Sequence, residues 1–189
     1  MKNIVLFASG SGTNAENIIL HFKKSREANV VAVFCNNPKA KVLERAQKHH
    51  VTAVVFSKED LKTEIFLQKL NEFQPDLIVL AGFLLQLPEN IIQSYSNKII
   101  NIHPALLPKY GGKGMYGMNV HQSVLENKES ETGITIHYVN EHYDEGKIIF
   151  QKNVVIKDCI TAEEIAVKIH ELEQEYFPEV IEKLITSNI

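Results

Sequence analysis

The stretch Ile4-Val5-Leu6-Phe7-Ala8-Ser9-Gly10-Ser11-Gly12-Thr13-Asn14-Ala15 decides the expected architecture. Its first five residues form a short apolar run, which is typical of a buried strand, and a segment of helical period follows over residues 14–24. A strand, a glycine-rich turn and a helix in this order are typical of a βα unit on a parallel sheet. The turn is therefore expected at the carboxyl end of the first strand, where open α/β sheets bind ligands.

The same alternation continues along the chain. Further strands are predicted over residues 30–35, 53–56, 76–81, 98–102, 133–139 and 147–156, and helices over residues 39–49, 58–73, from about 88, and over 161–185. The last two strands follow closely enough to pair as a hairpin, and Thr161 with Glu164 forms a capping box at the final helix. We therefore expect an α/β fold: a Rossmann-like open, mostly parallel sheet flanked by helices, with a C-terminal antiparallel strand pair and a long terminal helix.

Length and composition limit the classes of function. A chain of 189 residues is expected to form one domain, and its net charge of −3 gives no electrostatic reason to expect a nucleic-acid partner. No apolar run approaches the roughly 20 residues of a membrane span or resembles a signal peptide, so we expect a cytoplasmic protein. Cys35 and Cys159 lie far apart, so the sequence predicts neither a disulfide framework nor a thiolate metal site.

The glycine-rich turn over residues 9–15 is the first candidate binding site. Glycines let an anion approach backbone N–H groups, and the start of a helix favours negative charge, so the turn is a candidate phosphate cradle. The plain alternative is a tight turn with a capping residue. The turn also fits a dinucleotide fingerprint, but the second strand ends in Phe34-Cys35-Asn36-Asn37 without the acid that usually binds a ribose hydroxyl. A phosphate-bearing substrate is therefore preferred over NAD.

Asn101 and His103 are the second candidate. They end a predicted buried strand two residues apart, so their side chains are expected on the same side, next to one reacting centre. Asp144, in the loop between the last two predicted strands, is the carboxylate that could join them. Taken singly, each residue is as well explained by a strand end or a turn.

Four ordered motifs together resemble the folate-dependent formyltransferases over nearly the whole chain. They are residues 9–14, Asp76-Leu77-Ile78-Val79-Leu80-Ala81-Gly82-Phe83, Asn101-Ile102-His103-Pro104-Ala105-Leu106-Leu107-Pro108-Lys109-Tyr110, and residues 133–146. The resemblance implies transfer of the formyl group of 10-formyltetrahydrofolate to the amine of glycinamide ribonucleotide in purine biosynthesis, with no metal. It also implies one formyltransferase domain over 1–189, with a nucleotide- or phosphate-binding half over 1–100 and a catalytic, folate-binding half over 101–189.

The resemblance further implies roles for single residues. Asn101 would donate a hydrogen bond to the formyl oxygen, protonated His103 would stabilise its negative charge, and Asp144 would keep His103 protonated and relay a proton. The ribonucleotide phosphate would meet Gly12, Thr13 and Asn14. Glu173 would recognise the glycinamide and ribose end, with a solvated helix face as its alternative. The folate would be bound by Asn101, Asn140, Glu141 and the segment Leu84, Leu85, Gln86 and Leu87, of which Leu84 and Leu87 are alternatively core residues.

Some features depart from the family pattern or leave other functions open. No basic residue follows Phe83, so Lys58 is the expected partner of the folate tail, and residues 111–119 form a long glycine loop that is either a lid or a linker. Relatives that act on methionyl-tRNA or hydrolyse formyltetrahydrofolate are expected to carry a further domain, for which 189 residues leave no room. An oxidoreductase that uses only the glycine turn is the less favoured alternative. The expected partners are two small molecules, without nucleic acid or membrane, and the chain is expected to be a monomer or a homodimer.

Overall fold

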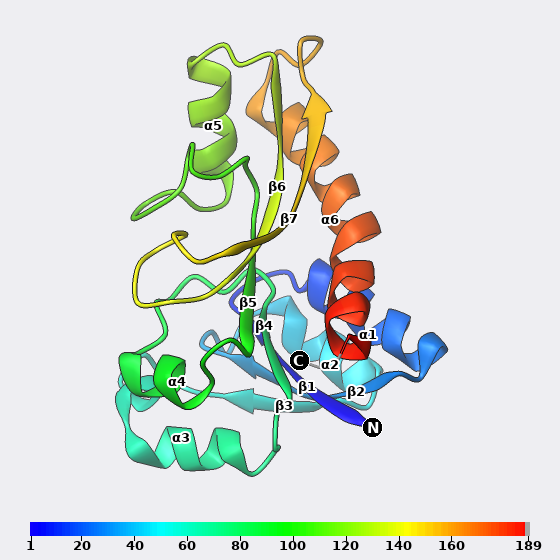
Figure 1. The fold of residues 1–189 in the computed structure, drawn as a ribbon, viewed down its shortest axis with the longest axis vertical. Coiled ribbons are helices and arrows are strands. Elements are labelled where there is room, and N and C mark those ends of the chain that lie inside the picture. Colours follow the sequence, from blue (N-terminus) through cyan, green and yellow to red (C-terminus); the bar gives the residue numbers. More distant parts are fainter. Residues whose placement is uncertain (188–189) are drawn as a thin grey trace. The chain divides into compact units, whose positions relative to one another are not determined.

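The computed structural model describes residues 1–187 (Figure 1). Its strands are β1 (Lys2–Ala8), β2 (Ala28–Cys35), β3 (Thr52–Val55), β4 (Leu77–Leu80), β5 (Ile99–His103), β6 (Glu131–Tyr138) and β7 (Ile148–Val155). Its helices are α1 (Thr13–Ser25), α2 (Lys41–Lys48), the 3-10 turn η1 (Asp60–Lys62), α3 (Glu64–Asn71), α4 (Glu89–Ser94), α5 (Met118–Glu126) and α6 (Ala162–Thr186).

The strands form one sheet in the order β3-β2-β1-β4-β5-β6-β7. β1 pairs in parallel with both β2 and β4, and β2 pairs in parallel with β3, whereas β6 and β7 are antiparallel. The predicted fold class is therefore confirmed, including the antiparallel pair and the long terminal helix. The single formyltransferase domain expected over 1–189 stays a prediction.

The chain divides into two compact units, and the first contains Met1–Ile100 together with the segment that starts at Pro178. Right-handed crossovers explain its layers, since they place α1 and α2 on one face of the sheet and α3 and α4 on the other (Figure 1). Polar contacts agree, because α1 meets α2 through Glu16 and Arg45 and α3 meets α4 through Glu64 and Asn90. An aromatic cluster fills the α3 face, with Phe7 stacked on Phe34 at 5.1 Å and Phe66 edge-on to both.

The second unit, Asn101–Phe177, contains the antiparallel ribbon of β6 and β7. The loop between these strands closes tightly, because a Cβ on Gly146 would lie 1.7 Å from the carbonyl oxygen of Tyr138. Phe150 of β7 stacks on Tyr176 of α6 with ring centroids 5.3 Å apart. The predicted capping box starts α6, since Glu164 N–H donates to Thr161 Oγ1 and Thr161 N–H donates to Glu164 Oε2, both at 3.2 Å.

Two predicted elements differ from the observed ones. The helix expected over 58–73 is interrupted, because Thr63 leaves helical geometry and its Oγ1 accepts the N–H of Phe66 as the N-cap of α3. The glycine loop expected over 111–119 ends early, since α5 starts at Met118 directly after Gly117. Val120 and Val124 supply its buried apolar face at helical spacing, a pattern too short to stand out in the sequence.

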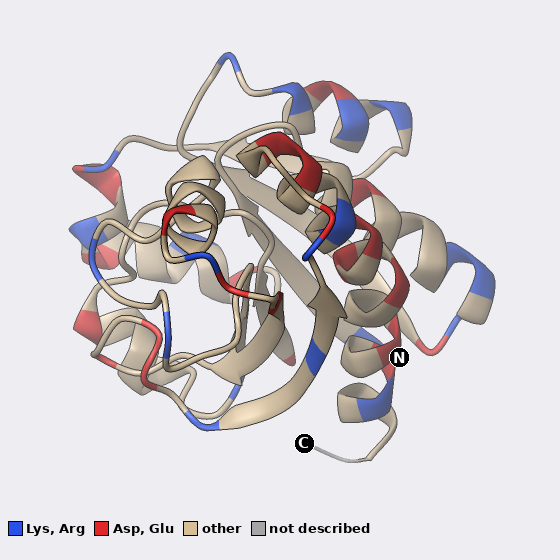
Figure 2. Ribbon diagram, turned by 90° about the horizontal axis from the view of Figure 1, so that it is seen from above, with Lys and Arg blue, Asp and Glu red and all other residues tan. Residues whose placement is uncertain are grey.

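Figure 2 shows that acidic and basic residues are interspersed over the helices, strands and loops. This agrees with 20 basic and 23 acidic residues and a net charge of −3. Within residues 1–187, no helix combines the length and the apolar character that crossing a bilayer requires.

Candidate active site

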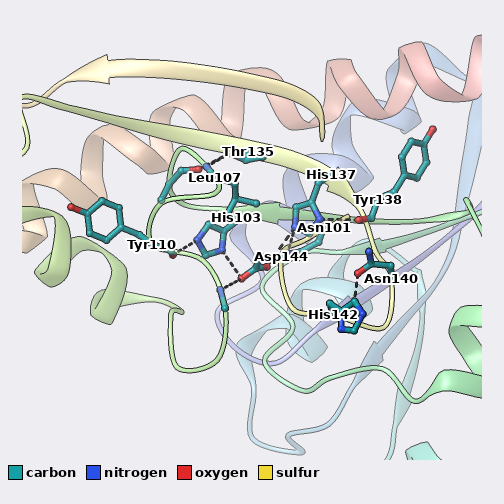
Figure 3. A network of polar contacts seen from close by, with 12 residues as sticks. Asn101, His103, Leu107, Tyr110, Thr135, His137, Tyr138, Asn140, His142 and Asp144 are labelled. Carbon is teal, nitrogen blue, oxygen red and sulfur yellow. Dashed lines mark hydrogen bonds and ion pairs between the residues drawn. The ribbon is translucent and has the colours of Figure 1, made fainter. Parts of the chain in front are cut away.

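Asn101, His103 and Asp144 meet in the second unit (Figure 3). Asn101 and His103 lie two residues apart at the carboxyl end of β5, as predicted, and Asp144 comes from the loop between β6 and β7. Nδ1 of His103 lies 3.6 Å from Oδ2 of Asp144, and the two side chains are only 4% and 12% exposed. The structure therefore brings the amide and the imidazole of one strand end together with a carboxylate that is distant from them in the sequence.

The carboxylate of Asp144 is held on several sides. Its Oδ2 accepts the backbone N–H of Gly112 at 2.9 Å, and its Oδ1 lies 3.6 Å from Nε2 of His137. The Asp144 backbone adopts a left-handed conformation with φ of 57°, which is uncommon for a residue other than glycine and occurs often at functional sites. The loop geometry thus directs this carboxylate toward two histidines.

The backbone fixes the protonation pattern of His103. Nε2 of His103 lies 2.7 Å from the carbonyl oxygen of Tyr110. A carbonyl oxygen only accepts, so Nε2 must carry a hydrogen, and Nδ1 is the atom that gains or loses a proton beside Asp144. His103 therefore switches between neutral and charged forms on the side that faces the carboxylate.

His137 of β6 is a site residue that the sequence interpretation missed. Its Nδ1 lies 2.8 Å from the carbonyl oxygen of Tyr138 and must donate to it, which leaves Nε2 of neutral His137 as an acceptor for Asn101 Nδ2 at 3.2 Å. His137 thereby orients the amide of Asn101. A usable signal was present, since His137 lies two residues after Thr135 in an alternating strand and therefore points to the same, buried face.

The two titratable partners respond differently to burial. Burial lowers the pKa of His103 below its ordinary value, although the charge of Asp144 and the Tyr110 carbonyl both work to raise it. Burial works to raise the pKa of Asp144, but the neighbouring His137 ring, the charge of His103 and the Gly112 N–H outweigh it and lower that pKa. The charge of Asp144 thus works toward the protonated form of His103, but burial has the larger effect.

A polar network centred on the buried Thr135 supports the segment that follows His103. Thr135 Oγ1 donates to the Ala105 carbonyl at 2.7 Å and accepts the Leu107 N–H at 3.0 Å. Gln151 Nε2 donates to both Thr135 Oγ1 and the Leu107 carbonyl, at 2.8 and 3.0 Å. β6 and β7 therefore fix the backbone between His103 and Tyr110.

The predicted phosphate cradle lies in the first unit at the start of α1. Gly12 is left-handed with φ of 74°, and the helix begins at Thr13, followed by Asn14. Before the glycines, Ser9 Oγ donates to Asn36 Oδ1 at 2.6 Å and accepts the Leu84 N–H at 3.0 Å. Ser9 thus ties together the segments that follow β1, β2 and β4.

The other predicted binding residues are divided between the two units. In the first unit, Lys58 is exposed between β3 and η1, Leu84 is 53% exposed, and Leu87 is 4% exposed and belongs to the core. In the second unit, Asn140 and Glu141 lie in the loop before Asp144, and Glu173 of α6 is 14% exposed. Glu173 lies 3.5 Å from Nδ1 of His170 and is not a solvated side chain. The remaining predicted residues, Leu85 and Gln86, lie between Leu84 and Leu87.

Comparison with known families gives one match that covers almost the whole chain. The model of the formyl transferase family matches residues 2–181. The phosphoribosylglycinamide formyltransferase of Bacillus subtilis (strain 168) is 36% identical over an alignment that covers 100% of this chain and 97% of that protein. The enzyme of the same name from Escherichia coli (strain K12) is 32% identical and is aligned over 95% of this chain and 85% of its own length.

Solved structures give the same result. The crystal structure of glycinamide ribonucleotide transformylase 1 from Geobacillus kaustophilus superposes with a TM-score of 0.89 at 37% identity, over 98% of this chain and 99% of that one. The phosphoribosylglycinamide formyltransferase of Anaplasma phagocytophilum superposes with a TM-score of 0.90 at 31% identity, over 100% of this chain and 89% of that one.

Proposed function

Because the chain belongs to the formyl transferase family, we propose that it is an enzyme that formylates glycinamide ribonucleotide. It transfers the formyl group of 10-formyltetrahydrofolate to the glycinamide amine and releases formylglycinamide ribonucleotide and tetrahydrofolate. The observation that best supports this proposal is that Nδ1 of His103 lies 3.6 Å from Oδ2 of Asp144, with Asn101 beside them. Full-length relatives named phosphoribosylglycinamide formyltransferase support the choice of substrate.

The reaction replaces one carbon–nitrogen bond by another. The amine nitrogen attacks the formyl carbon, negative charge develops on the formyl oxygen, and the bond from carbon to N10 of the folate then breaks. An amide donor and a nearby positive charge stabilise such an oxyanion best when both are held in place before the reaction. Asn101 and protonated His103 supply these two groups in a buried site.

The geometry defines how each of the two residues acts. Since Nε2–H of His103 is taken by Tyr110, His103 acts through the charge it gains when Nδ1 is protonated. Asn101 Nδ2 carries two hydrogens: one donates to Nε2 of His137, which orients the amide, and the other is available to the formyl oxygen. Asp144 stabilises charged His103 and relays the proton that leaves the amine to N10 of the folate, directly or through water.

The binding roles complete the proposal. The N–H groups around Gly12, Thr13 and Asn14 bind the phosphate of the ribonucleotide, and Glu173 binds its glycinamide and ribose end. Leu84, Leu85 and Gln86, with Asn140 and Glu141, line the folate, and Lys58 pairs with its acidic tail. Leu87 supports this segment from the core. The reaction runs in the cytoplasm, and the chain acts as a monomer or a homodimer.

The decisive test is the absorbance change of 10-formyltetrahydrofolate with the purified protein, in the presence and absence of glycinamide ribonucleotide. Loss of the formyl group that requires the ribonucleotide, with formylglycinamide ribonucleotide identified by mass spectrometry, is the expected result. Equal deformylation without the ribonucleotide would make the protein a hydrolase. If the protein does not formylate glycinamide ribonucleotide but does formylate another amine, it is a formyltransferase with a different acceptor substrate.

A further inference from the structure

Helix α2 holds the backbone of the glycine turn through two carbonyl groups. The N–H of Val42 donates to the carbonyl oxygen of Gly10 at 3.2 Å, and Nε of Arg45 donates to the carbonyl oxygen of Ser11 at 2.8 Å. The packing between them is close, because a Cβ on Gly12 would lie 2.4 Å from Cγ2 of Val42. The turn is therefore anchored from the side of α2.

These two anchors determine where the N–H groups of the turn point. In a trans peptide the carbonyl oxygen and the N–H of the following residue point in opposite directions. Since the carbonyls of Gly10 and Ser11 point toward α2, the N–H groups of Ser11 and Gly12 point away from it. Two donors of the turn are thereby presented next to the first N–H groups of α1, which a helix leaves without intrahelical partners.

Arg45 is itself held by an acid on α1. Its guanidinium pairs with Oε2 of Glu16, whose other oxygen lies 2.7 Å from Nε2 of His49 and 3.4 Å from Nζ of Lys48. The Glu16 side chain is 14% exposed. A bare carboxylate in the first turn of α1 would repel a phosphate at that helix end, so its pairing with the guanidinium of Arg45 removes a conflict with the proposed ligand.

We propose that Arg45, clamped by Glu16, is the positioning residue of the phosphate turn: it draws the Ser11 carbonyl toward α2 and so orients the N–H donors that bind the ribonucleotide phosphate. Arg45 need not touch the phosphate to do this, since its Nε and one terminal nitrogen are already engaged by Ser11 and Glu16. The role rests on the proposed function, because it assigns a purpose to the same phosphate turn.

The test compares Arg45→Gln with Lys48→Gln, which removes a positive charge from the same Glu16 without a contact to Ser11. The probe is ribose 5-phosphate, whose dissociation constant is measured by titration calorimetry and does not depend on turnover. Arg45→Gln should weaken ribose 5-phosphate binding and raise the KM for glycinamide ribonucleotide by about tenfold, the usual worth of one charge-assisted hydrogen bond. Since only ground-state binding of the phosphate is lost, kcat and the KM for the folate should change by less than about twofold.

The outcomes separate position from charge. Lys48→Gln should keep both constants close to the wild-type values, and an equal loss in Lys48→Gln would make the effect one of net charge and overturn the proposal. Unchanged binding in Arg45→Gln would overturn it as well. If Arg45→Gln does not fold, Arg45→Lys serves in its place, because one ammonium cannot serve both Ser11 and Glu16 with the geometry of a guanidinium. If the wild-type protein binds ribose 5-phosphate but formylates no ribonucleotide, only the proposed function is refuted. If it binds neither ribose 5-phosphate nor glycinamide ribonucleotide, the positioning role is refuted.

Discussion

Nε2 of His103 lies 2.7 Å from the carbonyl oxygen of Tyr110, so the backbone permanently occupies one of the two ring nitrogens. The Tyr110 residue is itself fixed, because its backbone is left-handed with φ of 56° and its hydroxyl donates to Oε1 of Glu129 at 2.9 Å. Burial, together with the hydrogen bond to Glu129 and the charge of Glu129, raises the pKa of the Tyr110 hydroxyl to about 12, so it remains a donor across the working pH range. Proton gain and loss at His103 is thereby confined to Nδ1.

Asp144→Asn is expected to shift the pH dependence of turnover. Asp144 is the largest influence that raises the pKa of His103 against its burial, so removing the charge lowers that pKa further. Activity that needs protonated His103 is lost as pH rises through this pKa. In the variant the loss should therefore begin at a lower pH than in the wild type, and it is measured as kcat/KM against pH.

Asp158→Asn is the matched control, since Asp158 is an exposed acid of the same unit that pairs with Lys168. It should retain the wild-type profile. A profile of Asp144→Asn that coincides with the wild-type curve, at any level of activity, would show that Asp144 does not govern the charge of His103.

Asn101→Ala is expected to lower kcat by about 10²–10³, the usual loss when one oxyanion donor is removed. The variant should remain folded, because Asn101 is only partly buried and its hydrogen-bond partner, His137 Nε2, keeps Asp144 as a neighbour at 3.6 Å. Steady-state kinetics and the thermal midpoint of unfolding measure the two effects separately. Asn153→Ala on the exposed part of β7 is the control, and a kcat within about twofold of wild type for Asn101→Ala would remove this residue from the mechanism.

The sequence predicted the first half of the fold well because its signals are local. The apolar runs in β1, β2 and β4 are largely buried and are followed within two residues by glycine or asparagine, so the strand type and the approximate carboxyl ends were predicted. β1 and β2 start two residues earlier than predicted, where most of the residues are polar. The interruption before α3 was missed, since Thr63 reads equally well inside a helix or at its cap. The short helix α5 was missed because the segment just before it, residues 111–117, contains four glycines, which favour a loop over a helix start.

Only the part of the site that lies on one strand was predictable from the sequence. The common orientation of Asn101 and His103 follows from their spacing, but the contact with Asp144 depends on how the β6–β7 loop closes over Gly146. His137 was overlooked because a lone histidine in an alternating strand looks like any buried polar residue. The lowered pKa of His103 could not be predicted from the sequence, because it follows from burial in the folded chain. Burial has a larger effect than the charge of Asp144, which the sequence does suggest.

Thr135→Val should destabilise the protein without touching the reacting groups. The substitution keeps the shape but removes a hydroxyl that serves the Ala105 carbonyl, the Leu107 N–H and the Gln151 amide. Leaving buried partners unsatisfied costs about 1–3 kcal/mol, so we expect a loss of this size in the free energy of unfolding, measured with urea. Thr132→Val, at a buried threonine of the same strand outside this network, should cost less. Equal costs would mean that the network adds nothing beyond burial of the strand.

His121→Leu is expected to reduce the sensitivity of the protein to acid. Nδ1 of His121, on α5, is buried with no hydrogen-bond partner among the residues that the structure describes. Burial lowers the pKa of His121 from its ordinary value of 6.5, although the charge of Glu173 opposes this effect. The unfolded chain therefore binds the proton more readily than the folded one, so stability is complete above the unfolded pKa and is lost as pH falls through the folded pKa.

The test measures the free energy of unfolding at about pH 7.5 and at about pH 5.5, where a single histidine of this kind accounts for a difference on the order of 1 kcal/mol. His121→Leu should show a smaller drop between the two conditions than the wild type, with the remainder set by other groups such as His103, whose pKa burial also lowers. His142→Leu, at an exposed histidine of the same unit, is the control and should keep the wild-type drop. If His121→Leu shows the same decrease in the free energy of unfolding as the wild type, His121 binds its proton equally well in the folded and unfolded chains. The burial of Nδ1 then does not reduce stability at low pH.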